Sequence, residues 1–289
     1  TSEPGLLGHL PSSPLATKLI SIMEQFPLLP FTDPERHRII SEIIRSHSAN
    51  TADIREIALE GIALEGVRDV LDLGCGFGFM AGAVAPRISF RGRIIGVDAC
   101  PENGPSFLEA VRANGREAEF LHRMIDCELP WPSSSFDLVI ASYSMYFFPD
   151  IVPEIARVLR PEGVLVTITH SERSFARLCA AAGFELEDTP IFRLVRRFSV
   201  ENGERILGRA FGNTRRVDFF NELLFERDQL ESLLAYAQFK YPLFREVRSA
   251  SAPLDAALCE ALERRLQNAE PFRIEKDDAV FIAWSSRCR

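Results

Sequence analysis

The sequence predicts an α/β fold: a doubly wound, mostly parallel sheet with helices on both faces and an added helical lid. Short apolar runs typical of buried strands alternate with helical patterns between residues 67 and 169. Such alternation is typical of parallel sheets that helices cover on both faces. One run, residues 70–78 (VLDLGCGFG), breaks directly into a glycine-rich turn, as a strand does when it leads into a helix beside a ligand.

Length and composition indicate a globular protein. The chain has 289 residues, of which 46% are hydrophobic and 26% charged, so it can bury a sizeable core. A formal net charge of −8 disfavours nucleic acid or an anionic membrane as the main partner. We find no apolar run long enough to span a membrane and no signal-peptide pattern. We therefore expect a cytoplasmic protein with no nucleic-acid or membrane partner, and the oligomeric state stays open.

The cysteines do not indicate a metal site. Six of them are scattered at positions 75, 100, 127, 179, 259 and 288, and no two form a C-x-x-C pair. Neither a zinc site nor a redox dithiol is predicted. Reduced thiols in the cytosol are the simplest interpretation, so we expect no bound metal.

Helical patterns precede the first strand, at residues 14–25, 34–47 and 51–65. The second begins with Asp33 before Pro34, an N-cap followed by proline at the first helical position. None of these helices is needed to build the sheet. We expect residues 1–65 to form an N-terminal cover over the site.

The glycine-rich turn indicates a particular class of ligand. Gly74, Gly76 and Gly78 let the backbone approach a ligand closely, because no Cβ intrudes. The dinucleotide fingerprint G-x-G-x-x-G fails, since Phe79 occupies its third glycine position. Asp72, at the mouth of the turn, would repel a pyrophosphate but attract an ammonium group. A nucleoside joined to a positively charged amino acid fits better, and S-adenosylmethionine is such a ligand.

The elements after the turn agree with a nucleoside ligand. Residues 93–98 predict a second strand that ends in Asp98, about 20 residues past the turn, where an acid reaches ribose hydroxyls. The remaining elements of this region are a helix at 105–113, a polar loop at 125–131, a strand at 135–142, a helix at 151–159 and a fifth strand ending at Thr169.

Together these motifs, in this order, resemble class I S-adenosylmethionine-dependent methyltransferases, most closely those that act on small molecules. The resemblance covers residues 66–170, the expected cofactor-binding core, with a weaker tail to residue 289. It implies a Rossmann-like sheet of seven strands whose last strand is antiparallel. It also implies cofactor contacts: the methionine portion on Asp72, Gly74, Cys75 and Gly76, the ribose on Asp98 beside Ala99, the adenine edge on Asp126 and Cys127, and the methionine side lined by Ala141 and Ser142.

The C-terminal third has two interpretations. Residues 175–184 and 230–239 are similar, and either could be the helix that follows the fifth strand. We favour the second, which predicts a sixth strand at 242–247. Residues 171–225 then form a helical lid insertion, and residues 226–289 complete the sheet with a helix at 253–268 and a last strand at 279–284.

Catalytic candidates follow the fourth and fifth strands, because ligands lie beyond the carboxyl ends of parallel strands. They are Tyr143, Tyr146 and His170. His170 could be a general base or a polar residue that bonds the sheet edge, and the tyrosines could bind ligand or pack. His37 could face the cleft or solvent. Because the methyl donor is already activated, we expect positioning to dominate and His170 to be at most an auxiliary base.

Phenylalanines are concentrated in the expected lid, where they could line an apolar acceptor pocket or hold lid to sheet. The sequence therefore predicts an enzyme that transfers a methyl group from S-adenosylmethionine to a small-molecule acceptor, with oxygen favoured over nitrogen or carbon. The alternatives are an RNA or protein methyltransferase, or a cofactor-binding protein without transfer activity. The lid phenylalanines are Phe192, Phe198, Phe211, Phe219, Phe220 and Phe225.

Overall fold

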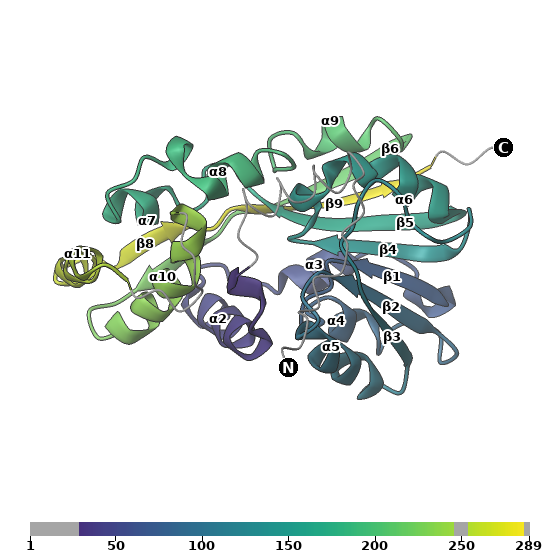
Figure 1. Ribbon diagram of the computed structural model, residues 1–289, viewed down its shortest axis with the longest axis horizontal. Coiled ribbons are helices and arrows are strands. Elements are labelled where there is room, and N and C mark those ends of the chain that lie inside the picture. Colours follow the sequence, from purple (N-terminus) through teal and green to yellow (C-terminus); the bar gives the residue numbers. More distant parts are fainter. Residues whose placement is uncertain (1–28, 246–253, 286–289) are drawn as a thin grey trace, which may run out of the picture.

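The computed structural model describes residues 29–245 and 254–285 (Figure 1). Its main element is a seven-stranded sheet in which β9 runs antiparallel to both of its neighbours and the other pairs are parallel. This confirms the predicted fold class. The strands, in spatial order, are β3 (Glu117–His122), β2 (Arg93–Asp98), β1 (Asp69–Leu73), β4 (Phe136–Ser142), β5 (Leu159–His170), β9 (Asp278–Trp284) and β6 (Asn213–Phe219).

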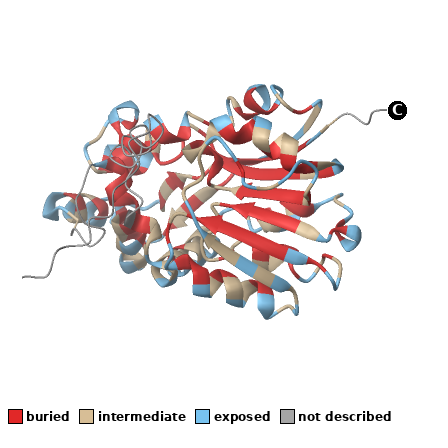
Figure 2. Cartoon of the chain, turned by 45° about the vertical axis from the view of Figure 1, so that its right-hand side comes forward, coloured by how far each residue is buried: buried red, intermediate tan, exposed pale blue. Residues whose placement is uncertain are grey.

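Helices cover both faces of the sheet because alternate strand residues point to opposite sides. On β1, Leu71 and Leu73 pack in one apolar cluster and Val70 in another. Figure 2 shows that the central strands are buried along most of their length. One cluster includes helices α6 (Val152–Val158) and α9 (Gly203–Leu207); the other includes α3 (Ile54–Leu59), α4 (Ala81–Val84) and α5 (Asn103–Arg112).

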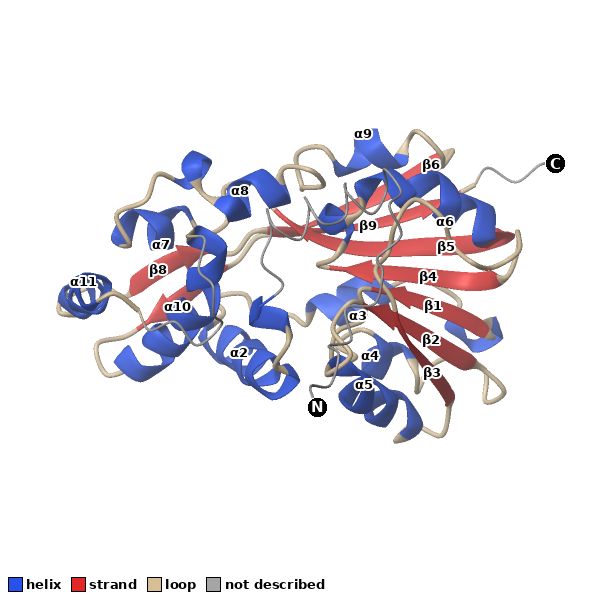
Figure 3. Cartoon of the chain, in the orientation of Figure 1, coloured by secondary structure: helices blue, strands red, loops and turns tan. Residues whose placement is uncertain are grey.

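A second layer of structure lies beyond the carboxyl ends of the parallel strands (Figure 3). We call it the cap, and it has an apolar cluster of its own. A two-stranded ribbon joins it to the sheet, because β6 continues through Asn221 into β7 and β8 continues through Lys276 into β9. The cap consists of α2 (Pro34–His47), α7 (Ala176–Ala181), α8 (Pro190–Val195), α10 (Leu230–Phe244), α11 (Ala256–Leu266), β7 (Glu222–Phe225) and β8 (Phe272–Glu275).

Helix α2 confirms the predicted helix at 34–47. Asp33 caps it, because its carboxylate accepts a hydrogen bond from the backbone N–H of Arg36 at 3.0 Å. The helix predicted at 14–25 lies outside the described residues.

The sixth strand of the sheet differs from the prediction. It is β6, which carries Arg215, Arg216 and Asp218 and therefore has no apolar pattern. An edge strand with one exposed face tolerates such charges. The predicted strand at 242–247 is wrong, because α10 runs as helix through Pro242 to Phe244. Hence part of the sheet lies within residues 171–225, and α10 and α11 lie in the cap.

Gly96 on β2 allows the sheet to pack closely against the glycine-rich turn. A methyl group on Gly96 would lie 2.5 Å from Cζ of Phe107 and 2.7 Å from Sγ of Cys75. We predict that Gly96→Ala lowers the free energy of unfolding by about 1–3 kcal/mol, as overpacking does. Urea denaturation measures this change in the free energy of unfolding. Gly66→Ala is the control, because no atom lies within 4 Å of a methyl group there; an equal loss in both variants would contradict the packing argument.

Candidate active site

A cavity of about 530 Å³ lies between the carboxyl ends of β1, β2, β4 and β5 and the cap. Its volume falls in the range of small-molecule and cofactor sites. The core contributes Gly74, Cys75, Gly76 and Ala99, all of which the sequence predicts as cofactor contacts. The cap contributes residues of α2, α8 and α10.

The glycine-rich turn adopts a conformation that favours glycine. Gly74, Gly76 and Gly78 have φ angles of +68°, +51° and +92°. A methyl group on Gly74 would lie 2.5 Å from Cβ of Ser144, whereas one on Gly76 would meet nothing within 4 Å. The backbone at Gly76 is therefore open to the cavity, as close approach of a ligand requires.

Asp72 is a buried carboxyl group at the mouth of the glycine-rich turn. It is 2% exposed, it lines the cavity, and its Oδ2 has no hydrogen bond to any described residue. Burial, with a smaller contribution from the charge of Asp98, raises the pKa of Asp72 to about 8. A buried carboxyl is stabilised in its charged form by a cation, so this group fits the ammonium end of the predicted cofactor.

Asp98 joins β2 to the turn and to α5. Its Oδ2 accepts from the backbone N–H of Gly76 at 2.8 Å, and its Oδ1 accepts from the N–H of Cys100 at 2.8 Å and Nδ2 of Asn103 at 3.2 Å. Burial raises its pKa, and these hydrogen bonds oppose the shift. Since a carboxylate oxygen accepts more than one hydrogen bond, Oδ2 can also bind a ligand hydroxyl. The sequence analysis did not identify Asn103, which lines the cavity and whose buried Oδ1 has no hydrogen bond to a residue that the structure describes.

The other predicted cofactor residues do not all line the cavity. Ser142 does, and its buried Oγ has no partner in the described part of the chain, while Ala141 is fully buried and does not line the cavity. Asp126 accepts from the N–H of Glu128, and Cys127 is exposed; both lie outside the lining, so their adenine contact stays a prediction. In their place the loop contributes residues Arg123, Met124 and Ile125 to the lining.

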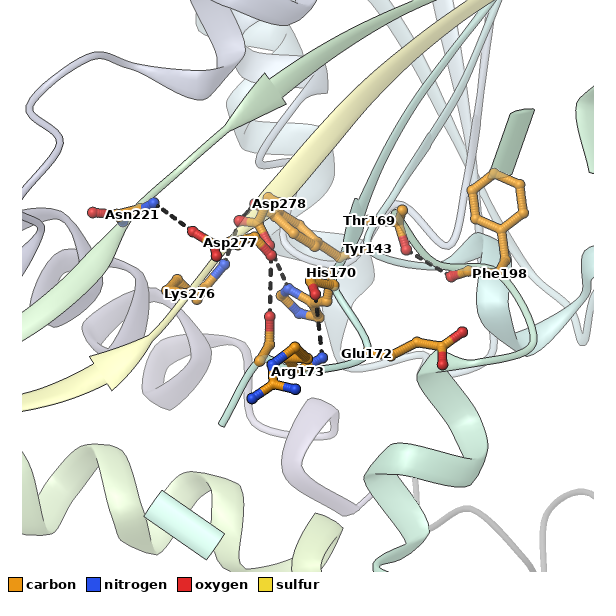
Figure 4. A network of polar contacts seen from close by, with 12 residues as sticks. Tyr143, Thr169, His170, Glu172, Arg173, Phe198, Asn221, Lys276, Asp277 and Asp278 are labelled. Carbon is orange, nitrogen blue, oxygen red and sulfur yellow. Dashed lines mark hydrogen bonds and ion pairs between the residues drawn. The ribbon is translucent and has the colours of Figure 1, made fainter. Parts of the chain in front are cut away.

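A buried polar network lies where β4, β5 and β9 meet the cap (Figure 4). Its centre is Asp278, which the register of β5 and β9 places opposite His170. Asp278 Oδ1 is 2.6 Å from Nδ1 of His170, and its Oδ2 accepts from the hydroxyl of Tyr143 at 2.7 Å and from Nζ of Lys276. All four residues line the cavity. Tyr146 also lines it, and its ring stacks on His170 at 6.2 Å between ring centroids.

The network keeps His170 neutral. Burial lowers the pKa of His170 to about 4, the charge of Lys276 adds to this, and Asp278 opposes it. Burial disfavours the Asp278 carboxylate, but Lys276 and His170 outweigh it and lower its pKa. The proton of the neutral imidazole then lies on Nδ1 facing Asp278, which leaves Nε2 as an acceptor.

The apolar wall of the cavity differs from the one predicted. Of the six lid phenylalanines only Phe219 lines the cavity; Phe198 and Phe211 pack on the sheet, as the alternative interpretation held. The aromatic wall comes instead from the turn, the segment after β4, α2 and α10. His37 lines the cavity and packs between Phe77, at 5.0 Å, and Phe239, at 5.4 Å.

Comparisons with known proteins find a methyltransferase domain in the part of the chain that forms the core end of this cavity. Residues 70–163 match the model of a family described as a methyltransferase domain. The chain is 36% identical over 92 residues to aklanonic acid methyltransferase DauC from Streptomyces sp. strain C5, covering 30% of this chain and 40% of that protein. It is 36% identical over 110 residues to a trans-aconitate 2-methyltransferase from Enterobacter sp. strain 638, covering 37% of this chain and 41% of that protein.

Solved structures show the same fold. That of YcgJ from Bacillus subtilis matches with a TM-score of 0.54 at 17% identity, covering 80% of this chain and 97% of that one. This chain spans about two fifths of the length of the curated relatives named above. The domain match confirms the predicted class I S-adenosylmethionine-dependent methyltransferase domain and, with it, the cofactor. Among the described residues no helix is long and apolar enough to cross a membrane.

Asp72 gives a prediction for cofactor binding. With a pKa of about 8 the group is mostly protonated at neutral pH, and a bound ammonium group ionises it. S-adenosylhomocysteine carries the same ammonium group as S-adenosylmethionine. Its binding should therefore release close to one proton. Calorimetry at neutral pH in buffers of different ionisation enthalpy measures this release. Asp72→Asn should bind much more weakly and release none; equal release by both proteins would contradict the assignment.

The same group gives a prediction for stability. Its pKa is raised on folding from 3.8 to about 8, so between these values the native state holds a proton that the unfolded chain loses. The ligand-free protein therefore loses stability as pH rises through this window. The gain in Tm of Asp72→Asn over the native protein should be larger at about pH 8 than at about pH 5. If the gain in Tm does not change with pH, the pKa of Asp72 in the folded protein is close to its ordinary value and the assignment is contradicted.

Proposed function

We propose that this chain, whose residues 70–163 carry the methyltransferase domain of the class I S-adenosylmethionine-dependent family, transfers a methyl group to a small-molecule acceptor held under the cap. The observation that carries the proposal is the continuity of the cavity. The cofactor-binding turn and the cap line the same cavity of about 530 Å³, so donor and acceptor would meet inside it.

The position of the cap favours a small acceptor over RNA or protein. The cap lies over the carboxyl ends of the strands, where a macromolecule would need an open surface, and the net charge of −8 disfavours RNA. DauC and the Enterobacter relative are named for small acids, aklanonic acid and trans-aconitate. A cytoplasmic location belongs to the same proposal, since the five cysteines in the described segments are all free thiols.

The residues of the chain would contribute mainly binding, orientation and a dry cleft. When bound, S-adenosylmethionine supplies a methyl group activated by the positive sulfur. Asp72 would hold its ammonium group and Asp98 its ribose, since both line the core end of the cavity. The aromatic wall around His37 would keep water from the reacting groups once both ligands are bound, which favours displacement at a charged sulfur. Aligning acceptor, methyl and sulfur is the largest contribution asked of the protein.

His170 would orient the acceptor. Its Nε2 makes no hydrogen bond to a described residue, and Asp278 fixes the orientation of the ring. An acceptor hydroxyl can donate to Nε2 and pass its proton there as the methyl group is transferred, which favours oxygen as the acceptor atom. A histidine with a pKa of about 4 is a weak base at neutral pH, however. We therefore assign His170 a positioning role, which Tyr143 supports through Asp278 and Tyr146 through stacking.

Methyl transfer itself is the first test. Tritium-labelled S-adenosylmethionine is incubated with the protein and with separate pools of small metabolites, tRNA and proteins. We expect label in the small-metabolite pool. Asp98→Ala should weaken binding of S-adenosylhomocysteine about tenfold or more, as loss of a charged acceptor does, and Asp188→Ala, at an exposed position, should not. Label in tRNA or protein, or cofactor binding with no transfer to any pool, would overturn the proposal in favour of an alternative.

His170 is tested by single-turnover transfer with the acceptor so identified, between about pH 6 and pH 9. We predict that the rate of transfer by His170→Ala falls by no more than about tenfold at any pH, because a weak base contributes little. The affinity for the acceptor should fall by a larger factor than the rate. His47→Ala is the matched control, since that ring packs on Phe225 in the cap and does not line the cavity. A loss of about a hundredfold or more, with a titration that disappears, would make His170 a general base.

A further inference from the structure

Lysine is rare in this chain. Three lysines, at positions 18, 240 and 276, stand beside 30 arginines. Lys240 and Lys276 line the same cavity, and they are 7% and 4% exposed. Arginine therefore supplies nearly all of the positive surface charge, whereas both lysines that the structure describes are buried beside the expected acceptor. An ammonium group on a flexible stem differs from a guanidinium in that it is a compact point charge.

The two buried lysines differ in their partners. Nζ of Lys276 donates to Oδ2 of Asp278. Nζ of Lys240 has neither a hydrogen bond nor an ion pair with any described residue; it lies 4.9 Å from the centroid of the Phe175 ring and 5.4 Å from that of Phe239. Ring faces attract a cation but do not replace a counterion. A buried charge without a counterion is costly, which suggests that a ligand supplies one.

At the cap end of the cavity, Lys240 is the one buried lysine without a counterion among the described residues. Asp278 balances Lys276, and burial keeps His170 and His37 neutral, with a pKa of about 4 for each. The core end holds two carboxyl groups instead, Asp98 and Asp72, and Asp72 ionises when an ammonium group binds beside it. Burial, with the charge of Lys276 and against that of Asp278, lowers the pKa of Lys240 to about 7, so an anion beside it would favour its ammonium form.

An apolar wall runs from Lys240 to the glycine-rich turn. Phe239, next to Lys240 in α10, stacks on His37, and His37 contacts Phe77 of the turn. His170 and Tyr143 lie in the same cavity. A ligand with an apolar or aromatic body can thus reach from Lys240 at the cap to the methyl donor at the turn.

We propose that Lys240 binds a carboxylate of the methyl acceptor, so that the acceptor is a small organic acid with an apolar or aromatic body. This inference rests on the proposed methyl transfer and specifies its substrate class. A carboxylate is favoured over a phosphate ester, because phosphate sites usually combine several donors, such as arginine forks or backbone N–H groups. Lys240 instead presents a single ammonium group among aromatic rings.

The test compares charged and neutral probes of equal shape. Benzoate, cinnamate, para-coumarate and indole acetate, each with its primary amide, are titrated into the protein saturated with S-adenosylhomocysteine. At least one acid should bind about tenfold or more tightly than its amide, because only the acid pairs with the ammonium group. Lys240→Met should abolish that preference, and Lys240→Arg should keep most of it. Tyr236→Phe is the control, since it removes a buried hydroxyl of the same helix without changing charge.

Two readouts separate the possible failures. Lys240→Met should keep its affinity for S-adenosylhomocysteine and its Tm, because an apolar side chain replaces an unpaired buried charge. If Lys240→Met does not fold, the inference is tested by comparing the affinities of acid and amide for the native protein and for Lys240→Arg. No preference for any acid over its amide, or an unchanged preference in a folded Lys240→Met, would overturn the inference. Failure of the native protein to bind S-adenosylhomocysteine would instead overturn the proposed function.

Discussion

The carboxylate of Asp278 connects the two halves of the molecule. It lies at the point where the ribbon from the cap enters the sheet, and it bonds His170 from β5, Tyr143 after β4 and Lys276 from the ribbon. Removing such a buried carboxylate would leave three polar groups without their partner in a dry environment. The orientation of His170 and the placement of the cap over the turn both depend on this group.

Acidic and basic side chains lie at different ends of the cavity, on either side of Asp278. The core end holds Asp72 and Asp98 and suits a cofactor with an ammonium group and ribose hydroxyls. The cap end holds Lys240, which has no counterion within residues 29–245 and 254–285, beside the balanced pair of Lys276 and Asp278. Opposite charges at the two ends would orient donor and acceptor before reaction, which agrees with a site whose contribution is alignment in a dry cleft.

The sequence predicted those parts of the fold whose causes are local. Gly74 and Gly76 mark the turn because their positive φ angles favour glycine, and Asp33 marks the start of α2 because its side chain caps it. β6 was missed because the charges of an edge strand hide its pattern. The polar network could not be predicted, since only the pairing of β9 with β5 brings Asp278 to His170 across 108 positions of sequence. The scarcity of lysine can be seen in the sequence. Only the structure shows that Lys240 and Lys276 both line the cavity.

The central claim is that one cavity holds the cofactor by its core end beneath the cap. The most direct measurement is a crystal structure of the protein with S-adenosylhomocysteine. We expect the amino group of the ligand within hydrogen-bond distance of the Asp72 carboxylate, the ribose hydroxyls on Asp98, and the sulfur facing the part of the cavity lined by His170 and Lys240. A ligand bound outside this cavity, or with its ribose away from Asp98, would contradict the account.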